Sequence, residues 1–238
     1  MPTATVNAAL FVQRSLARLS QVAGASMDRV GEAARLVADC IAADGVVHAF
    51  GTGHSQAAVM ELAGRAGGFI PTNRIGLGDI VLYGGEPPEA LANLLLEREP
   101  GLAPRLYALA APRPGDVFVI ISNSGVNNVV VEMALRVREA GHRLIAVTSV
   151  EHTTAVPARH PSGQRLADLA DVVLDNGAPA GDALLDLPGG TAVGALSSLT
   201  AALLIQMVVT EATGLLLAAG HTPPVYRSSN VPGGYEYN

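Results

Sequence analysis

Apolar and polar residues alternate with helical spacing over the first 43 positions of the chain, and this spacing changes abruptly after them. Val6, Leu10 and Ala17 mark the apolar face of a first predicted helix. A second helix is predicted over residues 26–43, and the following Asp44-Gly45 is a typical helix end. The chain is therefore expected to begin with a helical pair within residues 1–44.

Beyond residue 45, short runs of consecutive apolar residues alternate with stretches of helical spacing. The runs predict buried strands at 46–50, 117–121, 144–147 and 171–174, and Phe69-Ile70 is a further short candidate. Helices are predicted from residue 56 to about 66, over 127–140 and over 194–219. Apolar strands that alternate with helices are typical of a parallel sheet covered on both faces. The pattern predicts one α/β domain, with its core at 45–220 and a C-terminal tail at 221–238.

The segment 187–210 carries no charged residue and is long enough to cross a bilayer. It also contains Pro188, three glycines and several hydroxyl residues, and its apolar part is rich in alanine. These features favour a helix buried in a core or a subunit interface. The N-terminus also lacks the basic region of a signal peptide. We therefore expect a cytoplasmic protein that does not bind membranes.

The residues that follow the predicted strands are mostly glycine or small and polar. They are Gly51-Thr52-Gly53-His54-Ser55, then Ser122-Asn123-Ser124-Gly125, and then Thr148-Ser149. Because the carboxyl ends of parallel strands meet at one edge of a sheet, all three segments are expected at a single ligand-binding rim. Hydroxyl groups and backbone N–H groups at helix N-termini bind phosphate well. Ordinary helix capping explains any one loop, but three loops favour a phosphate site.

Composition narrows the chemistry of this rim. All 15 basic residues are arginine, and the lack of lysine excludes Schiff-base, pyridoxal phosphate, P-loop and protein kinase chemistry. A dinucleotide is disfavoured because Gln56 stands where the fingerprint requires a third glycine. The net charge of −6 and the scattered arginines indicate no nucleic-acid partner. The single cysteine, Cys40, lies in an apolar stretch and is predicted to be buried.

Several motifs along the chain resemble those of one known family. They are GTGHS at 51–55, RAGG at 65–68, ISNSG at 121–125, VEMA at 131–134, RHPSG at 159–163, ADVVLDNGAPAGDA at 170–183 and SSNVPGG at 228–234. Together they are similar to a stand-alone subgroup of the sugar isomerase (SIS) domain family. The resemblance implies a three-layer αβα sandwich with a five-stranded parallel, flavodoxin-like sheet. It also implies that the partner is a phosphorylated sugar and that the chain forms a homo-oligomer, a dimer or tetramer with shared active sites.

The resemblance assigns the phosphate group to the serine loops. The implied phosphate ligands are Ser55, Ser122, Asn123 and Ser124, with Asn127 and Thr148 as adjacent candidates. The candidates for contact with the sugar are Thr52 and Gly53 in the first loop, Asp182 after the fourth strand, and Asn230 in the tail.

Proton transfer on a sugar requires a carboxylate or an imidazole. Glu61 lies six residues past Ser55, about 9 Å along the predicted helix, although an ion pair with Arg65 is the structural alternative. His54 lies inside the phosphate loop. His160 lies in a polar segment that is expected to reach the same rim. These three residues, Glu61, His54 and His160, are the catalytic candidates.

The other histidines are expected to have structural roles. His48 lies within a predicted strand and should pack in the core, whereas His142 and His221 are expected at the surface. The sequence has no HxxxH or HExxH pair that would indicate a metal site. We predict metal-independent chemistry without a cofactor.

Several reactions begin with removal of the C2 proton of a phosphosugar, and the sequence leaves them open. An N-acetyl group at C2 blocks aldose–ketose isomerisation, so an N-acetylated sugar would favour epimerisation or elimination. We favour an amino-sugar 6-phosphate, N-acetylglucosamine 6-phosphate in particular, that loses water by 2,3-elimination. Aldose–ketose isomerisation or epimerisation is the alternative. A phosphosugar sensor without catalytic activity is the second class of function.

Overall fold

One long helix precedes the sheet in the computed structural model, which describes residues 6–93 and 95–238. Helix α1 runs without a break from Ala8 to Ala42, so the predicted N-terminal helical segment is one helix and not two. Val22, Ser26, Val30 and Ala34 are buried at every fourth position of α1. This stripe continues through the point where a break was expected, and Ser26 is buried in it instead of capping a second helix.

Five parallel strands form the sheet, in the order β2-β1-β3-β4-β5. Their bounds are β1 Val47–Gly51, β2 Thr72–Ile75, β3 Val117–Ile121, β4 Arg143–Thr148 and β5 Val172–Asp175. The four apolar runs are confirmed as β1, β3, β4 and β5. The short candidate Phe69-Ile70 is wrong, because the edge strand β2 begins at Thr72 and Phe69 instead forms an antiparallel bridge with Val225 of the tail.

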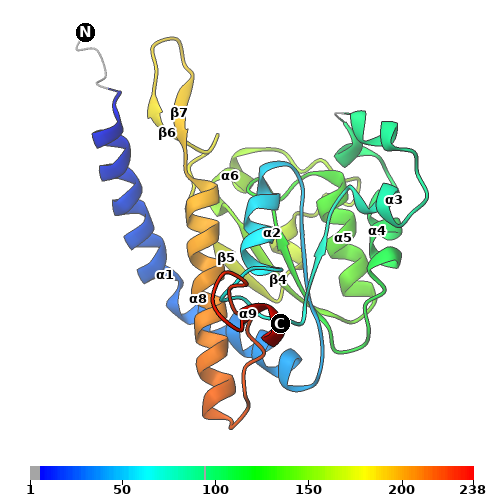
Figure 1. Cartoon of the computed structure of the whole chain (residues 1–238). Coiled ribbons are helices and arrows are strands. Elements are labelled where there is room, and N and C mark those ends of the chain that lie inside the picture. The colour runs from blue at the N-terminus through cyan, green and yellow to red at the C-terminus, as the bar shows by residue number, and fades with distance from the viewer. Residues whose placement is uncertain (1–5, 94) are drawn as a thin grey trace.

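Helices cover both faces of this sheet, which confirms the predicted three-layer α/β fold (Figure 1). Helices α1, α2 (Gln56–Leu62) and α8 (Ser197–Ala218) lie on one face, while α4 (Leu102–Ala110) and α5 (Asn128–Glu139) lie on the other. Successive residues of β1 point to opposite faces, so Val47 and Ala49 join the first core and Phe50 joins the second.

The remaining elements are short. They are α3 (Asp79–Leu82), α6 (Val150–Ala155), α7 (Leu166–Leu169) and α9 (Gly234–Tyr237), and the 3₁₀ turns η1 (Gly53–Ser55), η2 (Pro88–Ala92) and η3 (Leu96–Arg98). Helix α2 ends at Leu62, four residues before the predicted end at 66, and Gly64 follows with a φ of +78°. A left-handed backbone at this glycine is typical of a helix stop.

A two-stranded hairpin that the sequence pattern did not predict precedes α8. Strands β6 (Ala183–Asp186) and β7 (Ala192–Ala195) pair antiparallel. Figure 1 shows the hairpin beside the N-terminal half of α1, away from the sheet. Arg14 Nη1 donates to the carbonyl oxygen of Leu184 at 2.7 Å, and the ring of Phe11 lies directly over Gly194. We call residues 8–20 of α1 together with this hairpin the arm.

Among the described residues, α8 is the one helix whose length and composition would allow it to cross a membrane. Its buried residues Leu204, Ile205 and Val208 belong to the same apolar core as α1 and β1. α8 therefore packs as a core helix, which agrees with the prediction that the uncharged segment 187–210 forms a buried helix.

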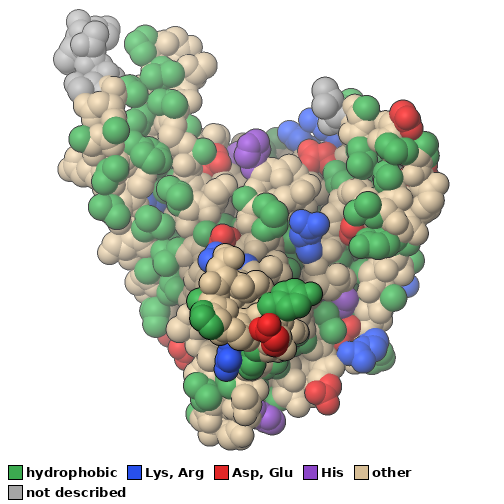
Figure 2. Space-filling view, viewed as in Figure 1, with side chains coloured by type: hydrophobic (Ala, Val, Ile, Leu, Met, Phe, Trp, Pro, Cys, Tyr) green, Lys and Arg blue, Asp and Glu red, His purple; other side chains and the backbone are tan. Residues whose placement is uncertain are grey.

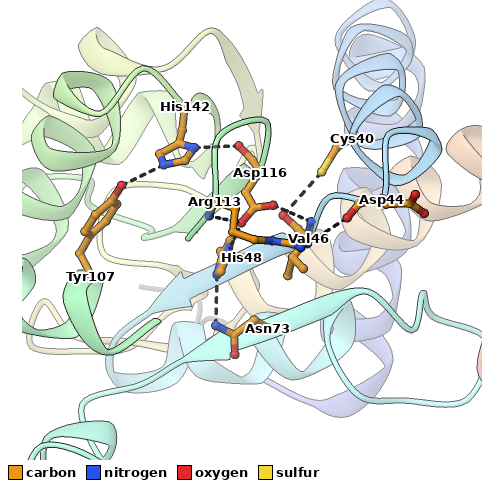
Figure 3. A network of polar contacts seen from close by, with 9 residues as sticks. All are labelled: Cys40, Asp44, Val46, His48, Asn73, Tyr107, Arg113, Asp116 and His142. Atoms are coloured by element: carbon orange, nitrogen blue, oxygen red, sulfur yellow. Dashed lines mark hydrogen bonds and ion pairs between the residues drawn. The ribbon is translucent and has the colours of Figure 1, made fainter. Parts of the chain in front are cut away.

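Polar side chains gather at the amino ends of β1 and β3, where Figure 3 shows them in one network. His48 Nε2 donates to Asp116 Oδ2 at 3.0 Å, and both side chains are almost fully buried. Asn73 Nδ2 donates to His48 Nδ1 at 3.1 Å. His142 bridges the carbonyl oxygen of Asp116 and the hydroxyl group of Tyr107. His48 is in the core as predicted, but the surface position predicted for His142 is wrong. We call these five residues the amino-edge network.

Burial and hydrogen bonding set the charge of the network. Burial lowers the pKa of His48 and outweighs the hydrogen bond to Asp116, which acts in the opposite direction. Burial also acts to raise the pKa of Asp116, but hydrogen bonds from the N–H groups of Arg113 and Val46 and from His48 leave this pKa lowered. The pair is therefore an ionised carboxylate with a neutral imidazole at pH 7. The nearby Cys40 is buried as predicted, and burial raises the pKa of its thiol to about 11.

Candidate active site

The loops that follow β1, β3 and β4 lie at one rim, because these strands are parallel neighbours in the sheet. The loop after β3 has the most constrained backbone of the three. Gly125 has a φ of +64°, and a Cβ atom there would lie 3.0 Å from Thr148 Oγ1. Gly125 N donates to Ser122 Oγ at 3.1 Å. Glycine is therefore required at this position, and the close approach fixes the loop against the end of β4.

Several predicted phosphate ligands hold this loop in place. Thr148 is fully buried, and its Oγ1 donates to the carbonyl oxygen of Asn123 at 3.3 Å. The side chain of Asn123 accepts a hydrogen bond from Asn176 Nδ2 at 3.0 Å. Ser122 is also buried, whereas Ser124 is half-buried. In this structure Ser124 is therefore the hydroxyl of the β3 loop that is best placed to meet a ligand.

A small pocket of about 120 Å³ joins the first loop to the start of α8. Its polar lining consists of His54, Ser55, Asn123, Asn176, Asp182, Ser197 and Ser198. The sequence thus named four residues that the structure brings together here: His54, Ser55, Asn123 and Asp182. The carboxylate of Asp182 accepts hydrogen bonds from the N–H and the hydroxyl group of Ser197, each at 2.7 Å, so it caps α8 from inside the pocket.

One carboxylate at the rim was not identified from the sequence. Thr52 Oγ1 donates to Glu97 Oε2 at 2.7 Å, and Asn127 Nδ2 donates to Glu97 Oε1 at 3.1 Å. Arg159 Nη1 donates to the side-chain oxygen of Asn127 at 3.0 Å. Glu97 also lines a cavity of about 470 Å³ together with Gly53. Residues of the β1 loop, the start of α5 and two distant loops therefore meet around one half-buried carboxylate.

Glu97 and Arg159 were not identified from the sequence, because the sequence around each of them gives only a weak signal. Glu97 lies in the segment 83–101, which has neither helical nor strand periodicity, and its neighbours Arg98 and Glu99 give it the look of a surface charge run. Arg159 stands next to His160 in the RHPSG motif, and nothing in this motif distinguishes it from a surface arginine.

Glu61 lies near the end of the short helix α2. Its carboxylate forms an ion pair with Arg65, the alternative that the spacing indicated. Gln206 Nε2 of α8 donates to Glu61 Oε2 at 3.3 Å. These contacts attach Glu61 to α8 and to the stretch that follows α2, whereas Glu97 is attached to the rim loops.

The last two candidates from the sequence make contacts away from the serine loops. The imidazole of His160 is hydrogen-bonded within its own loop, with Nδ1 2.8 Å from Ser162 Oγ. Asn230 lines a cavity with Gly64, Arg65 and Ala66, which follow α2, while the phosphate loop precedes this helix. Neither side chain has a described hydrogen bond to Ser55, Ser122 or Ser124 within residues 6–93 and 95–238.

Metal ligation requires several His, Cys, Asp or Glu side chains that converge. Across the part of the chain that the structure describes, no group of three such side chains is close enough to hold an ion. Metal-independent chemistry stays a prediction.

The rim, with serine and glycine loops after neighbouring parallel strands, defines a class of α/β domain that binds its ligand at the carboxyl ends of the strands. The model of the SIS domain matches residues 10–149, and the chain therefore belongs to the SIS-domain family.

Relatives with a similar sequence span nearly the whole chain. The chain is 44% identical over 215 residues to a UPF0309 protein of Listeria monocytogenes, covering 89% of this chain and 85% of that one. It is 38% identical over 229 residues to a UPF0309 protein of Streptomyces avermitilis, covering 96% and 90%. These similarities agree with the stand-alone subgroup that the motifs indicated.

Solved structures share the fold at low sequence identity. The c3406 protein of Escherichia coli CFT073, solved in complex with a phosphosugar, is 18% identical with a TM-score of 0.56, and the match covers 86% of this chain and 87% of that one. The phosphoheptose isomerase GmhA of Neisseria gonorrhoeae is 19% identical with a TM-score of 0.55, covering 87% and 96%.

Proposed function

We propose that this protein is a phosphosugar enzyme that removes the C2 proton of an amino-sugar 6-phosphate, with N-acetylglucosamine 6-phosphate as the favoured substrate. The observation that carries the proposal is the carboxylate of Glu97, held by Thr52 and Asn127 beside the serine loops. The similar folds of a protein solved with a phosphosugar and of a phosphoheptose isomerase support a phosphosugar ligand.

The phosphate group would bind at the loop after β3. Ser124 offers a half-buried hydroxyl there, and α5 offers the N–H groups of its first turn. Ser55 offers a second hydroxyl from the loop after β1, across the small pocket. Ser122, Asn123 and Thr148 then act mainly by fixing the loop. No lysine is needed, because backbone dipoles and neutral hydroxyl groups can hold a phosphate.

Glu97 is the carboxylate best placed to act as the base. A carboxylate that accepts two hydrogen bonds at a rim has a defined orientation, and general-base catalysis depends on orientation before pKa. In the favoured reaction Glu97 takes the C2 proton, the C3–O bond breaks, and an acid such as His54 protonates the departing hydroxide to give water. Return of the proton to the other face of C2 would instead give epimerisation. Return of a proton to C1 would give isomerisation, but only on a sugar without the N-acetyl group.

Proton exchange in D₂O tests this assignment before any product is known. We expect the C2 proton of N-acetylglucosamine 6-phosphate to exchange with solvent in the presence of the protein, as followed by NMR. Glu97→Gln should slow the exchange by about 100-fold or more, since general-base catalysis contributes that much, and should leave sugar binding intact. Glu61→Gln should slow the exchange by less than about tenfold, because the Glu61 carboxylate is paired with Arg65 and is attached to α8 instead of the rim loops.

Glu99→Gln is the matched control, because Glu99 lies two residues away and its carboxylate accepts from Asn93, whereas the carboxylate of Glu97 accepts from Thr52 and Asn127. Its exchange rate should equal that of the unmodified chain. A larger loss in Glu61→Gln than in Glu97→Gln would move the base to α2. Binding without any exchange or turnover would identify a sensor and reject the enzyme.

A homo-oligomer is the second part of the proposal, and the arm supports it. Val12, Leu16 and Val193 expose much of their side chains on the arm, and Figure 2 shows apolar side chains along this projection. We expect light scattering at micromolar concentration to give a dimer or tetramer. Leu16→Glu should lower the measured mass, whereas Leu217→Glu, an exposed leucine on α8, should not. A monomeric parent chain would contradict this part.

A further inference from the structure

A second cavity lies at the opposite end of the sheet from the rim. It has a volume of about 600 Å³ and is lined by residues at the amino ends of β1 and β2, by α3 and by the end of α4. Small-molecule sites in proteins typically occupy about 300–1,000 Å³. His48, the second residue of β1, lines this cavity, and the rim begins after Gly51. At about 3.3 Å per strand residue, about 10 Å of strand lies between the two. A ligand here would be a second ligand and not a part of the sugar.

The polar wall of this cavity is the chain Asp116–His48–Asn73 of the amino-edge network. Two N–H groups, from Val46 at 2.8 Å and Arg113 at 2.7 Å, hold the Asp116 carboxylate. An ionised carboxylate only accepts, so His48 Nε2 carries the proton and His48 Nδ1 accepts from Asn73 Nδ2. This sequence of hydrogen bonds settles which atom of the Asn73 amide is nitrogen.

The consequence is a carboxamide fixed in orientation at a cavity wall. Asn73 is half-buried and lies on the edge strand β2, and Figure 3 shows its oxygen directed away from His48. The amide oxygen and the second N–H of the nitrogen stay available to a ligand. A paired acceptor and donor of this kind matches the hydrogen-bonding edge of a nucleobase.

The rest of the lining adds positive charge and a flat apolar surface. Arg113 is an exposed residue of the lining, and its Nη2 donates to the carbonyl oxygen of Asp44 at 2.9 Å. Arg74 also lines the cavity, but it follows Asn73 on β2, so its side chain leaves the strand on the opposite face. This part of the lining also carries one negative charge, the carboxylate of Asp79, which accepts a hydrogen bond from Gly76 N at 2.8 Å. Tyr83 exposes 74% of its surface at the same cavity. Arginine binds phosphate well, and an exposed aromatic ring can stack on a base.

We propose that the cavity lined by Asn73, Tyr83 and Arg113 binds a nucleoside monophosphate, with the base on Asn73 and Tyr83 and the phosphate on Arg113. This cavity would recognise a ligand and not catalyse a reaction, because both ring nitrogens of His48 are already hydrogen-bonded, one to Asp116 and the other to Asn73. The nearby hydroxyl group of Thr72 is also engaged, since it donates to the carbonyl oxygen of Phe69 at 3.0 Å.

Calorimetric titration of the full chain with AMP, GMP, CMP and UMP tests the proposal. We expect at least one to bind in the micromolar range. The corresponding nucleoside and ribose 5-phosphate should each bind at least about tenfold more weakly, since each loses one set of contacts worth about 1.4 kcal/mol. Excess N-acetylglucosamine 6-phosphate should not displace the nucleotide, because the sugar phosphate belongs to the rim.

Variants separate this cavity from any other site for the nucleotide. Asn73→Leu and Arg113→Ala should each weaken binding by about tenfold or more. Arg143→Ala should stay within about twofold, because Arg143 begins β4 at the same edge of the sheet but lies outside the cavity. The ¹⁵N shifts of the His48 ring should move on binding, while those of His221 stay unchanged.

Three results would overturn the inference. They are the absence of binding below about 1 mM for all four nucleotides, displacement by the sugar phosphate, and unchanged binding in a correctly folded Asn73→Leu protein. None of these results bears on the exchange assay at Glu97, so the two proposals stand or fall separately.

Discussion

The two ends of the parallel sheet carry polar groups in opposite ways. At the carboxyl rim the polar groups belong to loops, and Ser55, Ser124 and Asn127 stay partly exposed. At the amino edge His48 lies within a strand and Asp116 directly precedes one, and each exposes 3% or less of its side chain. Buried polar groups must be satisfied by one another, whereas loop groups can remain available to a ligand. The position of a polar group relative to the strand therefore decides whether it holds the fold or meets a substrate.

The two ends of the sheet nevertheless share one kind of side chain. Glu97 at the rim and Asn73 at the amino edge are both half-buried, and each shares a hydrogen bond with a better-buried neighbour, Thr52 for Glu97 and His48 for Asn73. A side chain of this kind keeps part of its hydrogen-bonding capacity for a ligand while its orientation is fixed. Fixed orientation, more than exposure, is what a binding or catalytic group needs.

Removal of the buried carboxylate gives the largest effect that we expect. Asp116→Ala leaves the N–H groups of Val46 and Arg113 and the imidazole of His48 without their acceptor. Each buried donor left without an acceptor costs about 1–3 kcal/mol, so the free energy of unfolding in urea should fall by about 4 kcal/mol. Asp28→Ala on the exposed side of α1 is the control, with a change within about 0.5 kcal/mol. A loss below about 1 kcal/mol would show that the Asp116 carboxylate does not stabilise the amino-edge network.

The strands could be predicted from the sequence because they are buried on both faces. β3 is apolar throughout, and His48 is the one ionisable residue of β1, so both strands stand out between helical patterns. The rim loops followed from the strands, since parallel order places their ends together. Local chain chemistry was therefore sufficient for the four buried strands and the serine loops, but not for the edge strand β2 or for α4.

Residues held by distant contacts could not be predicted in the same way. Glu97 is placed by Thr52 and Asn127, which are 45 and 30 positions away, and nothing near Glu97 in the sequence marks it. His142 is buried by Tyr107 and by the backbone of Asp116, although a Gly-His-Arg sequence before a strand is typical of a surface turn. The single helix α1 is also a tertiary effect, because α8 covers the stripe through Ser26.

Crowding of the phosphate loop should have the next largest effect. Gly125→Ala places a methyl group 3.0 Å from Thr148 Oγ1 in a left-handed backbone. The backbone alone costs about 1–2 kcal/mol, and the contact must also be relieved. We expect a loss of about 2 kcal/mol in the free energy of unfolding and weaker binding of inorganic phosphate.

The matched control for this change is Gly163→Ala. Gly163 has a similar φ of +72°, but no atom lies within 4 Å of the position that its Cβ would take. It should lose only the backbone contribution of about 1 kcal/mol and keep phosphate binding. Equal losses in the two variants would show that the approach of Gly125 to Thr148 does not constrain the rim.

Mild acid should destabilise the amino edge, with the smallest effect of the three. The folded chain lowers the pKa of His48 below the ordinary 6.5, so the unfolded chain binds more protons just below that pH. Stability is therefore complete above about pH 6.5 and falls as the pH decreases, by at most about 1.4 kcal/mol per pH unit for one proton. The lowered pKa of Asp116 adds a second loss below its ordinary 3.8. Urea unfolding at pH 7.5 and 5.5 should show the first loss in the parent chain and in the control His221→Gln, and His48→Gln should remove it. An unchanged slope in His48→Gln would show that the acid sensitivity does not come from His48.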